Sequence, residues 1–137
     1  MTITDGLYID AVVVKGTKRK FSCSIEQLND EENAFNALDL SPYSVRFRVL
    51  GSATADGEVL LEKLITQNSD VEVDGIIDNA TNGTFIFTVT EDDTKTLGLG
   101  KHPISLELLD ATSENVMYVL TEGSYQGEFS KLQIVQV

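Results

Sequence analysis

The sequence predicts an all-β sandwich of about seven to eight short antiparallel strands, with one short helical turn near residues 91–97. Apolar and polar side chains alternate through Tyr43–Leu50 and again through Thr84–Thr90, which indicates strands with one buried face. Turn-forming residues separate such segments at intervals near the roughly 8 to 12 residues typical of a β-sandwich. A single sheet would leave these apolar faces in water, so a second, packed sheet is expected.

Length and charge set further limits. A chain of 137 residues with 42% hydrophobic content predicts one domain spanning residues 1–137, with residues 1–7 as a flexible or docking arm. The net charge of -12 disfavours nucleic acid and anionic membranes as partners. No stretch approaches the roughly 20 apolar residues of a membrane helix, and the polar start lacks the regions of a signal peptide. We therefore expect synthesis in a cytoplasm.

The N-terminal part predicts two strands and a loop. Tyr8–Val14 and Arg19–Leu28 are β-branched or alternating segments, and a short turn joins them. Residues 29–38 are predominantly polar and indicate a loop, in which Phe35 and Leu38 are candidate plugs over one end of the sandwich. A single helical turn is the alternative for this segment.

The middle of the chain supplies the central strand and its neighbours. Pro42 fixes φ and Asp39 is able to accept hydrogen bonds from the turn backbone, so a turn is predicted before Tyr43–Leu50. Residues 58–66 lack clean alternation, and helix and strand both fit their period, but the short neighbouring elements favour a strand. Acids alternate with valines in residues 70–74, which predicts a half-exposed strand face.

The C-terminal half predicts a second core strand, a helical turn and a hairpin. Asn82-Gly83 is a turn signal that leads into Thr84–Thr90. Thr90 provides a capping hydroxyl ahead of three acids, which suit the positive end of a helix. The strands Ile104–Leu109 and Val116–Leu120 are expected to pair as a hairpin, and a last strand follows at residues 129–135. The predicted core comprises Phe21, Ile25, Val45, Phe47, Phe85, Phe87, Val89, Leu106 and Leu108.

Several of these landmarks occur together in one known family. They are Gly16-Thr17 before an alternating strand, Asp39-Leu40-Ser41 before the central strand, Gly83-Thr84-Phe85-Ile86-Phe87, the turn with Asp93-Thr94 and Leu97, Gly100 before the Ile104 strand, and Glu122-Gly123 before the last strand. In this order, from about Val12 to Val135, the chain resembles the N-terminal domain of the phage baseplate upper protein family, found in tail and fibre proteins of bacterial viruses.

The resemblance implies an immunoglobulin-like sandwich that acts as an adaptor or anchoring module in a virion. The implied partners are other phage virion proteins, with the chain present as a homo-oligomer or in multiple copies per particle. The implied location is the virion, after synthesis in the cytoplasm of a bacterial host. A tail, a baseplate or a fibre would each fit.

Residues that commonly carry chemistry have few partners in this sequence. His102 is the only histidine, so the sequence has too few histidines for a histidine-rich metal site and few partners for a nucleophile–base triad. Its position before Pro103 indicates a structural residue. Cys23 is the only cysteine and is interpreted as a small buried hydrophobe. Asp92 and Asp93 fit the first turn of a helix better than a catalytic carboxylate pair.

A partial calcium-loop pattern is the one metal motif. Asp70, Glu72, Asp74 and Gly75 have the spacing of the first half of such a loop. Thr81 stands where the loop needs a bidentate carboxylate. We therefore predict no metal site, no cofactor, no catalytic residue and no enzymatic activity.

Two classes of function remain, and the sequence favours the first. A structural interaction module needs only strand edges and surface. The one basic cluster is Lys15, Lys18, Arg19 and Lys20. It either docks on an acidic surface of a neighbouring copy or, as we prefer, forms a solvated strand end. The alternative is a carbohydrate- or ligand-binding sandwich for host-surface recognition.

A sugar site typically needs exposed aromatic platforms. The chain has no Trp, and its Phe residues fall mostly on inward positions. Tyr8, Tyr118 and Tyr125 are the aromatic rings left for the alternative.

Overall fold

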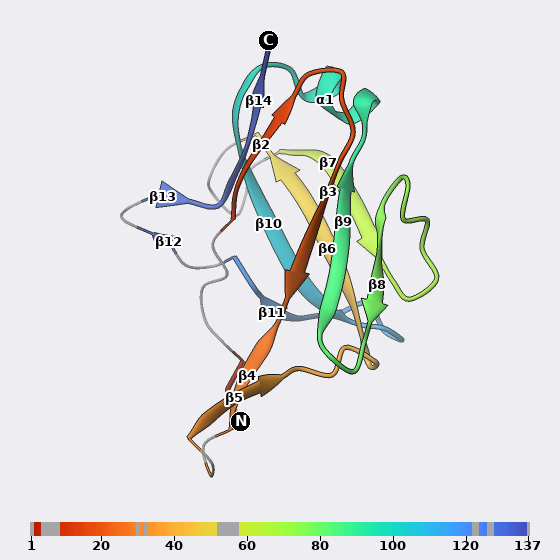
Figure 1. Ribbon diagram of the computed structural model, residues 1–137, viewed down its shortest axis with the longest axis vertical. Helices are drawn as coiled ribbons and strands as arrows, with labels where there is room; N and C mark the ends of the chain where they lie inside the picture. The colour runs from red at the N-terminus through yellow and green to blue at the C-terminus, as the bar shows by residue number, and fades with distance from the viewer. Residues whose placement is uncertain are drawn as a thin grey trace.

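Two β-sheets pack face to face in the protein, for which a computed structural model describes residues 2–3, 9–29, 31, 33–51, 58–121, 124–125 and 128–136 (Figure 1). The larger sheet contains, in spatial order, β2 (Asp10–Val14), β14 (Lys131–Val135), β10 (Gly100–Asp110), β6 (Tyr43–Leu50) and β7 (Val59–Ile65). The smaller sheet contains β3 (Arg19–Ser24), β9 (Thr84–Val89) and β8 (Gly75–Asn79). The predicted all-β sandwich is confirmed.

Shorter elements complete the structure. β11 (Val116–Val119) pairs with β10, which confirms the predicted hairpin. β1 (Thr2–Ile3), β4 (Glu26–Asn29) and β5 (Ala34–Ala37) form a small sheet, and β12 (Ser124–Tyr125) pairs with β13 (Glu128–Phe129). α1 (Glu91–Leu97) is the predicted helical turn. No helix in the described ranges is long and apolar enough to cross a membrane.

β6 is an interior strand of the larger sheet, between β10 and β7. Its inward residues Val45, Phe47 and Val49 are fully buried, as the alternating pattern predicts. The turn before it also forms as predicted, because Asp39 Oδ1 accepts hydrogen bonds from the N–H and the hydroxyl of Ser41 at 2.9 and 2.6 Å. The ambiguous segment at residues 58–66 contains a strand, β7.

The pairing of the N-terminal strands differs from a purely antiparallel arrangement. β2 and β14 run parallel. The turn between β2 and β3 also carries the chain from the larger sheet to the smaller one, so these two sequence neighbours are not sheet neighbours. Of the predicted arm, Thr2–Ile3 pair with β4, whereas residues 1 and 4–7 lie outside the described residues. The predicted last strand begins at Lys131, after the separate strand β13.

Residues 29–38 contain half of a hairpin, so the interpretation as a polar loop with an optional helical turn is wrong. β5 pairs with β4, and the two strands extend from the lower end of the sandwich in Figure 1. Leu38 is buried as expected, but Phe35 is 55% exposed. The long strand expected before this hairpin is interrupted at Ile25, whose N–H donates instead to the carbonyl of Gly83 at 2.9 Å.

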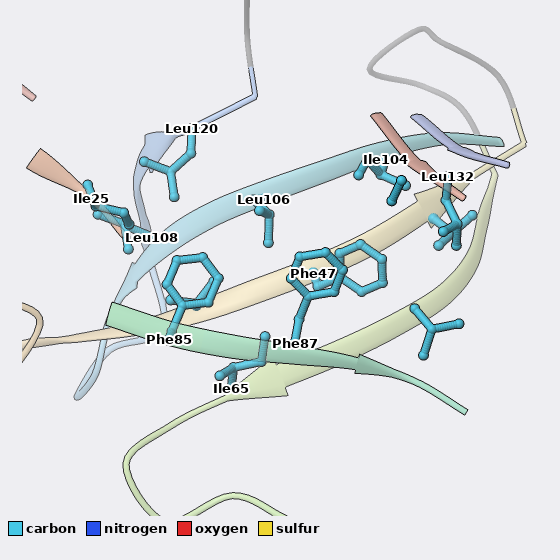
Figure 2. Packing of buried hydrophobic residues seen from close by; sticks show 14 of the residues in the cluster. Ile25, Phe47, Ile65, Phe85, Phe87, Ile104, Leu106, Leu108, Leu120 and Leu132 are labelled. Atoms are coloured by element: carbon cyan, nitrogen blue, oxygen red, sulfur yellow. The ribbon is translucent and has the colours of Figure 1, made fainter. Parts of the chain in front are cut away.

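Stacked aromatic rings occupy the centre of the core (Figure 2). Phe47 from the larger sheet stacks on Phe87 from the smaller sheet, with ring centroids 4.7 Å apart and planes at 21°. Phe21 stacks on Phe87 in the same way, at 4.8 Å and 19°. Phe21 is partly buried, and the other predicted core residues are buried.

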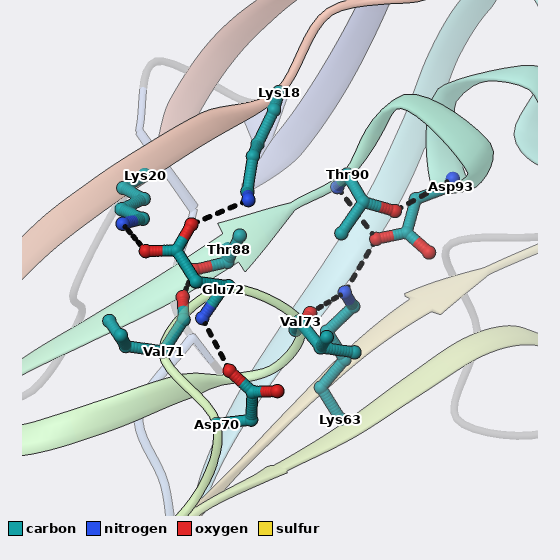
Figure 3. Close-up of polar contacts among 10 residues, drawn as sticks. All are labelled: Lys18, Lys20, Lys63, Asp70, Val71, Glu72, Val73, Thr88, Thr90 and Asp93. Atoms are coloured by element: carbon teal, nitrogen blue, oxygen red, sulfur yellow. Dashed lines mark hydrogen bonds and ion pairs between the residues drawn. The ribbon is translucent and has the colours of Figure 1, made fainter.

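A buried ion pair joins β7 to α1 (Figure 3). Lys63 is opposite Phe47 in the strand register and is only 3% exposed. Its Nζ lies 2.5 Å from Asp93 Oδ2 and donates to the carbonyl of Val73. Asp93 also accepts from the N–H of Thr90, whose hydroxyl accepts from the N–H of Asp93, so the same carboxylate completes a capping box.

We expect Phe47→Ala to lower the free energy of unfolding by about 3 to 5 kcal/mol, because it removes a buried ring and leaves a cavity. Small domains have only about 5 to 15 kcal/mol in total, so the variant should be close to unfolded. Urea denaturation measures the loss. Phe35→Ala, which truncates the exposed phenylalanine, is the control and should change stability by about 0.5 kcal/mol or less. Equal losses in the two variants would contradict the described core.

We expect Asp93→Asn to destabilise the protein by about 3 kcal/mol, since it leaves the buried ammonium of Lys63 without a counter-charge. Asp92→Asn is the matched control: Asp92 lies in the same first turn but is exposed, so only the helix-dipole contribution of roughly 0.3 to 1 kcal/mol is lost. Thermal and urea unfolding of both variants measure the difference. Similar losses in the two would show that the ion pair adds nothing beyond the dipole.

Candidate functional site

The acidic run at residues 70–74 is a turn, so the predicted strand face is wrong. The carbonyl of Asp70 accepts from the N–H groups of Val73, Asp74 and Gly75, and Asp70 Oδ1 accepts from the N–H of Glu72. Asp70 thus bends the backbone through its own side chain, as aspartate does in turns. Gly75 has φ +128, and a Cβ there would lie 2.0 Å from the carbonyl oxygen of Ile86, so the chain leaves the turn through a position that only glycine fits.

The acids of this turn do not gather into a metal site. Among the described residues, no group of three or more His, Cys, Asp or Glu side chains is placed to hold a metal ion. Instead, Glu72 lies 2.5 Å from Lys18 Nζ and 2.6 Å from Lys20 Nζ. The hydrogen bonds from these two ammonium groups lower the pKa of Glu72 from 4.5 to about 2. The turn is therefore tied to β3 by an ion triplet (Figure 3).

The predicted basic cluster is largely used within the chain. Lys18 and Lys20 bind Glu72, and the hydrogen bond that the Lys18 ammonium donates to the Glu72 carboxylate raises the pKa of Lys18. Arg19 donates to the carbonyl of Val12 at 2.6 Å and lies over the ring of Phe21, 5.0 Å from its centroid. These contacts fit the interpretation as a strand end rather than a free docking patch.

The other candidate residues have structural contacts. His102 Nε2 lies 3.0 Å from the carbonyl oxygen of Gly98, just after α1. Asp93 is committed to Lys63 and so does not pair with Asp92. Cys23 is half-buried on β3, and burial raises the pKa of its thiol to about 11, so the thiol is protonated at neutral pH.

A polar depression of about 360 Å³ lies at one end of the larger sheet, where β6 begins and β7 ends. The residues that line it include Ser44, Gln67, Asn68 and Glu114. Of the tyrosines left for a sugar site, Tyr118 is 42% exposed. Tyr8 and the side chain of Tyr125 lie outside the described residues.

β11 is an apolar strand that is exposed along its whole length, which the sequence did not predict. Its residues Val116, Met117, Tyr118 and Val119 are 45, 48, 42 and 43% exposed. Tyr118 alone among them touches another ring, that of Tyr43, at 6.5 Å and edge to face. One edge of β11 pairs with β10, and its other edge pairs with no strand of the described ranges. Four consecutive apolar residues without alternation normally indicate a strand that is buried on both faces, so the exposure of β11 is a finding of the structure alone.

The strand order defines the class of fold. One sheet contains β3, β9 and β8, and the other contains β2, β14, β10, β6 and β7. This arrangement is that of an immunoglobulin-like sandwich of the variable type, in which an additional strand extends the larger sheet beyond β6. The immunoglobulin-like fold is therefore confirmed.

Comparisons with known proteins add the following. The structure of the NK cell receptor Nkp44, described as a triggering partner in natural cytotoxicity, aligns over 91% of this chain and 97% of its own, with 14% identity and a TM-score of 0.49. The RIG-5 IG1 homodimer aligns over 99% and 96%, with 15% identity and a TM-score of 0.42. No family model and no curated protein matches the chain.

We expect Glu72→Gln to lower the melting temperature slightly at pH 7, because Lys18 and Lys20 lose their shared anion. The folded-state pKa of Glu72 is depressed from 4.5 to about 2, so its contribution to stability is fully present above pH 4.5 and is lost as the pH falls toward 2. The difference in melting temperature between wild type and variant should therefore become smaller as the pH falls over that range, and also in 1 M salt. Scanning calorimetry measures it. Asp78→Asn, at an exposed acid on β8, is the control, and a gap that grows on acidification would contradict the ion triplet.

Proposed function

We propose that this chain is a structural protein of a bacteriophage virion, an adaptor or anchoring module in the tail, baseplate or fibre that acts by protein–protein contact and catalyses no reaction. The observation that carries the proposal is β11, a strand with one unpaired edge and four half-exposed apolar side chains. An exposed edge of this kind invites pairing with other chains, and free proteins usually guard it. In an assembly the same edge is covered by a partner.

The viral setting is supported by the sequence resemblance to the phage baseplate upper protein family. The landmarks of that resemblance fall at turns that organise the sandwich. Asp39 caps the turn before β6, and Thr94 of α1 accepts from the N–H of Gly16 at 2.8 Å. On this proposal the partners are other virion proteins, and each particle carries multiple copies of the chain.

A second candidate function is a ligand-binding sandwich for host-surface recognition. The polar depression beside Ser44 and Glu114 favours it, because a hollow lined mainly by polar residues suits a hydroxyl-rich ligand such as a sugar. We place it second because the rings available for sugar stacking are few, and Tyr118 faces Tyr43.

We expect mass spectrometry of gradient-purified particles of the encoding virus to find the chain in fixed proportion to the other structural proteins. Deletion of its gene should give incomplete or non-infective particles, and supplying the intact gene in trans should restore them. A non-structural protein of the same virus serves as the carry-over control. If the chain is depleted from particles to the level of that control, the virion proposal fails and the ligand-binding alternative replaces it.

A further inference from the structure

We propose that the free edge of β11 binds an extended segment of a partner protein in which apolar residues alternate with lysine or arginine, and that this segment adds to the larger sheet as a new strand. The inference rests on the proposed function, since it names the surface and the partner chemistry through which the module would dock. Three features of the described residues support it: backbone direction, lack of guarding residues, and charge.

The backbone of β11 is oriented to accept a further strand. The N–H of Leu120 donates to the carbonyl of Leu106 on β10 at 2.8 Å. Backbone groups alternate in direction along an antiparallel strand, so the N–H and carbonyl of Val119 face away from β10. In the described structure no strand pairs with that side. These outward groups supply the hydrogen bonds of strand addition.

β11 also lacks the residues that normally prevent strand addition. Charges, proline and strand twist are the usual guards of an edge, and residues 115–121 contain no charged residue, proline or glycine. The edge strand β7, by contrast, carries charged residues that oppose strand addition. One of them is Glu62, whose carboxylate lies 2.9 Å from Arg48. At the sheet's far edge, the carbonyl of Val12 on β2 is occupied by Arg19.

Charge selects the partner. The turn that precedes β11 begins at the half-buried Asp110, whose carboxylate caps the turn, and contains the exposed acid Glu114. The arginines on β6 do not neutralise them, because Arg46 binds Glu107 at 2.9 Å and Arg48 binds Glu62. The whole chain carries -12. A basic partner strand is therefore attracted, whereas a second copy of this chain brings the same acids to the same edge.

The test uses the full chain and two short synthetic peptides, one alternating valine and lysine and one alternating valine and glutamate. We expect the valine–lysine peptide to bind about tenfold or more tightly than the valine–glutamate peptide. NMR titration should move the amide signals of residues 116–119 first. Raising the salt concentration should weaken the complex.

The decisive variant is V119K, which places a cation on the proposed edge. Its matched control is V59K. Val59 is also 43% exposed and lies on β7, the edge strand of the larger sheet that pairs with β6. V119K should lose the valine–lysine peptide and gain affinity for the valine–glutamate peptide, whereas V59K should behave as wild type. An unchanged preference in V119K, or an equal loss in V59K, would overturn the proposal. Circular dichroism checks that both variants are folded.

Self-association is the competing outcome. If sedimentation shows that wild type dimerises, that V119K is monomeric and that neither peptide competes, the occupant of the edge is a second copy and the proposal is overturned. Peptide binding and particle composition are separate measurements. If the chain binds the basic peptide at β11 but is absent from particles, this inference stands and the virion function is refuted. If the chain is present in particles but does not bind the peptide, the virion function stands and this inference is refuted.

Discussion

The stacking of Phe47 on Phe87 is the contact on which the sandwich depends, because it is made between the two sheets at the centre of the core. Immunoglobulin-like domains often join their sheets with a disulfide packed against a tryptophan. This chain has one cysteine and no tryptophan, so neither device is available within it. A disulfide typically contributes about 2 to 4 kcal/mol. The three-ring stack completed by Phe21 supplies cohesion by burial and ring contact instead.

The position of α1 follows from the same layer of the core. Lys63 faces inward from β7 opposite Phe47, and a buried ammonium is tolerated only beside an anion. Asp93 meets this requirement, while its capping box with Thr90 fixes where the helix begins. One carboxylate therefore ends β9, starts α1 and neutralises the core lysine. The helical turn and the sandwich are coupled through this single group.

The sequence was sufficient for features that depend on local chemistry. Alternation predicted β6 and β9, and Thr90 with its following acids predicted α1, because these signals need no distant partner. The parallel pairing of β2 with β14 and the sheet change after β2 depend on contacts across the whole chain, so no local pattern contains them. The run at residues 70–74 misled because acid–apolar alternation also suits a turn closed on an aspartate.

The same distinction applies to the candidate site. The pattern of residues 116–120 predicted a hairpin strand, and the strand is present. Exposure is a different property: it depends on whether anything covers the strand, which composition alone does not state. Lys63 was missed for the converse reason, since a lysine in a strand gives no sign that its register places it inside. In both cases the missing information is the position of the second layer.

β11 is well placed to bind because of the strand that holds it. β10 pairs with β6 along Ile104–Asp110 on one side, and with β14 and β11 on the other. Leu106 and Leu108 anchor β10 in the core without exposure. A partner that adds to β11 therefore meets a backbone already fixed in its bound geometry, so most of the ordering entropy falls on the partner alone. Arg46 and Arg48 on the neighbouring strand β6 are paired with Glu107 and Glu62, so within the described residues the edge of β11 combines an uncharged strand with the acids of the preceding turn.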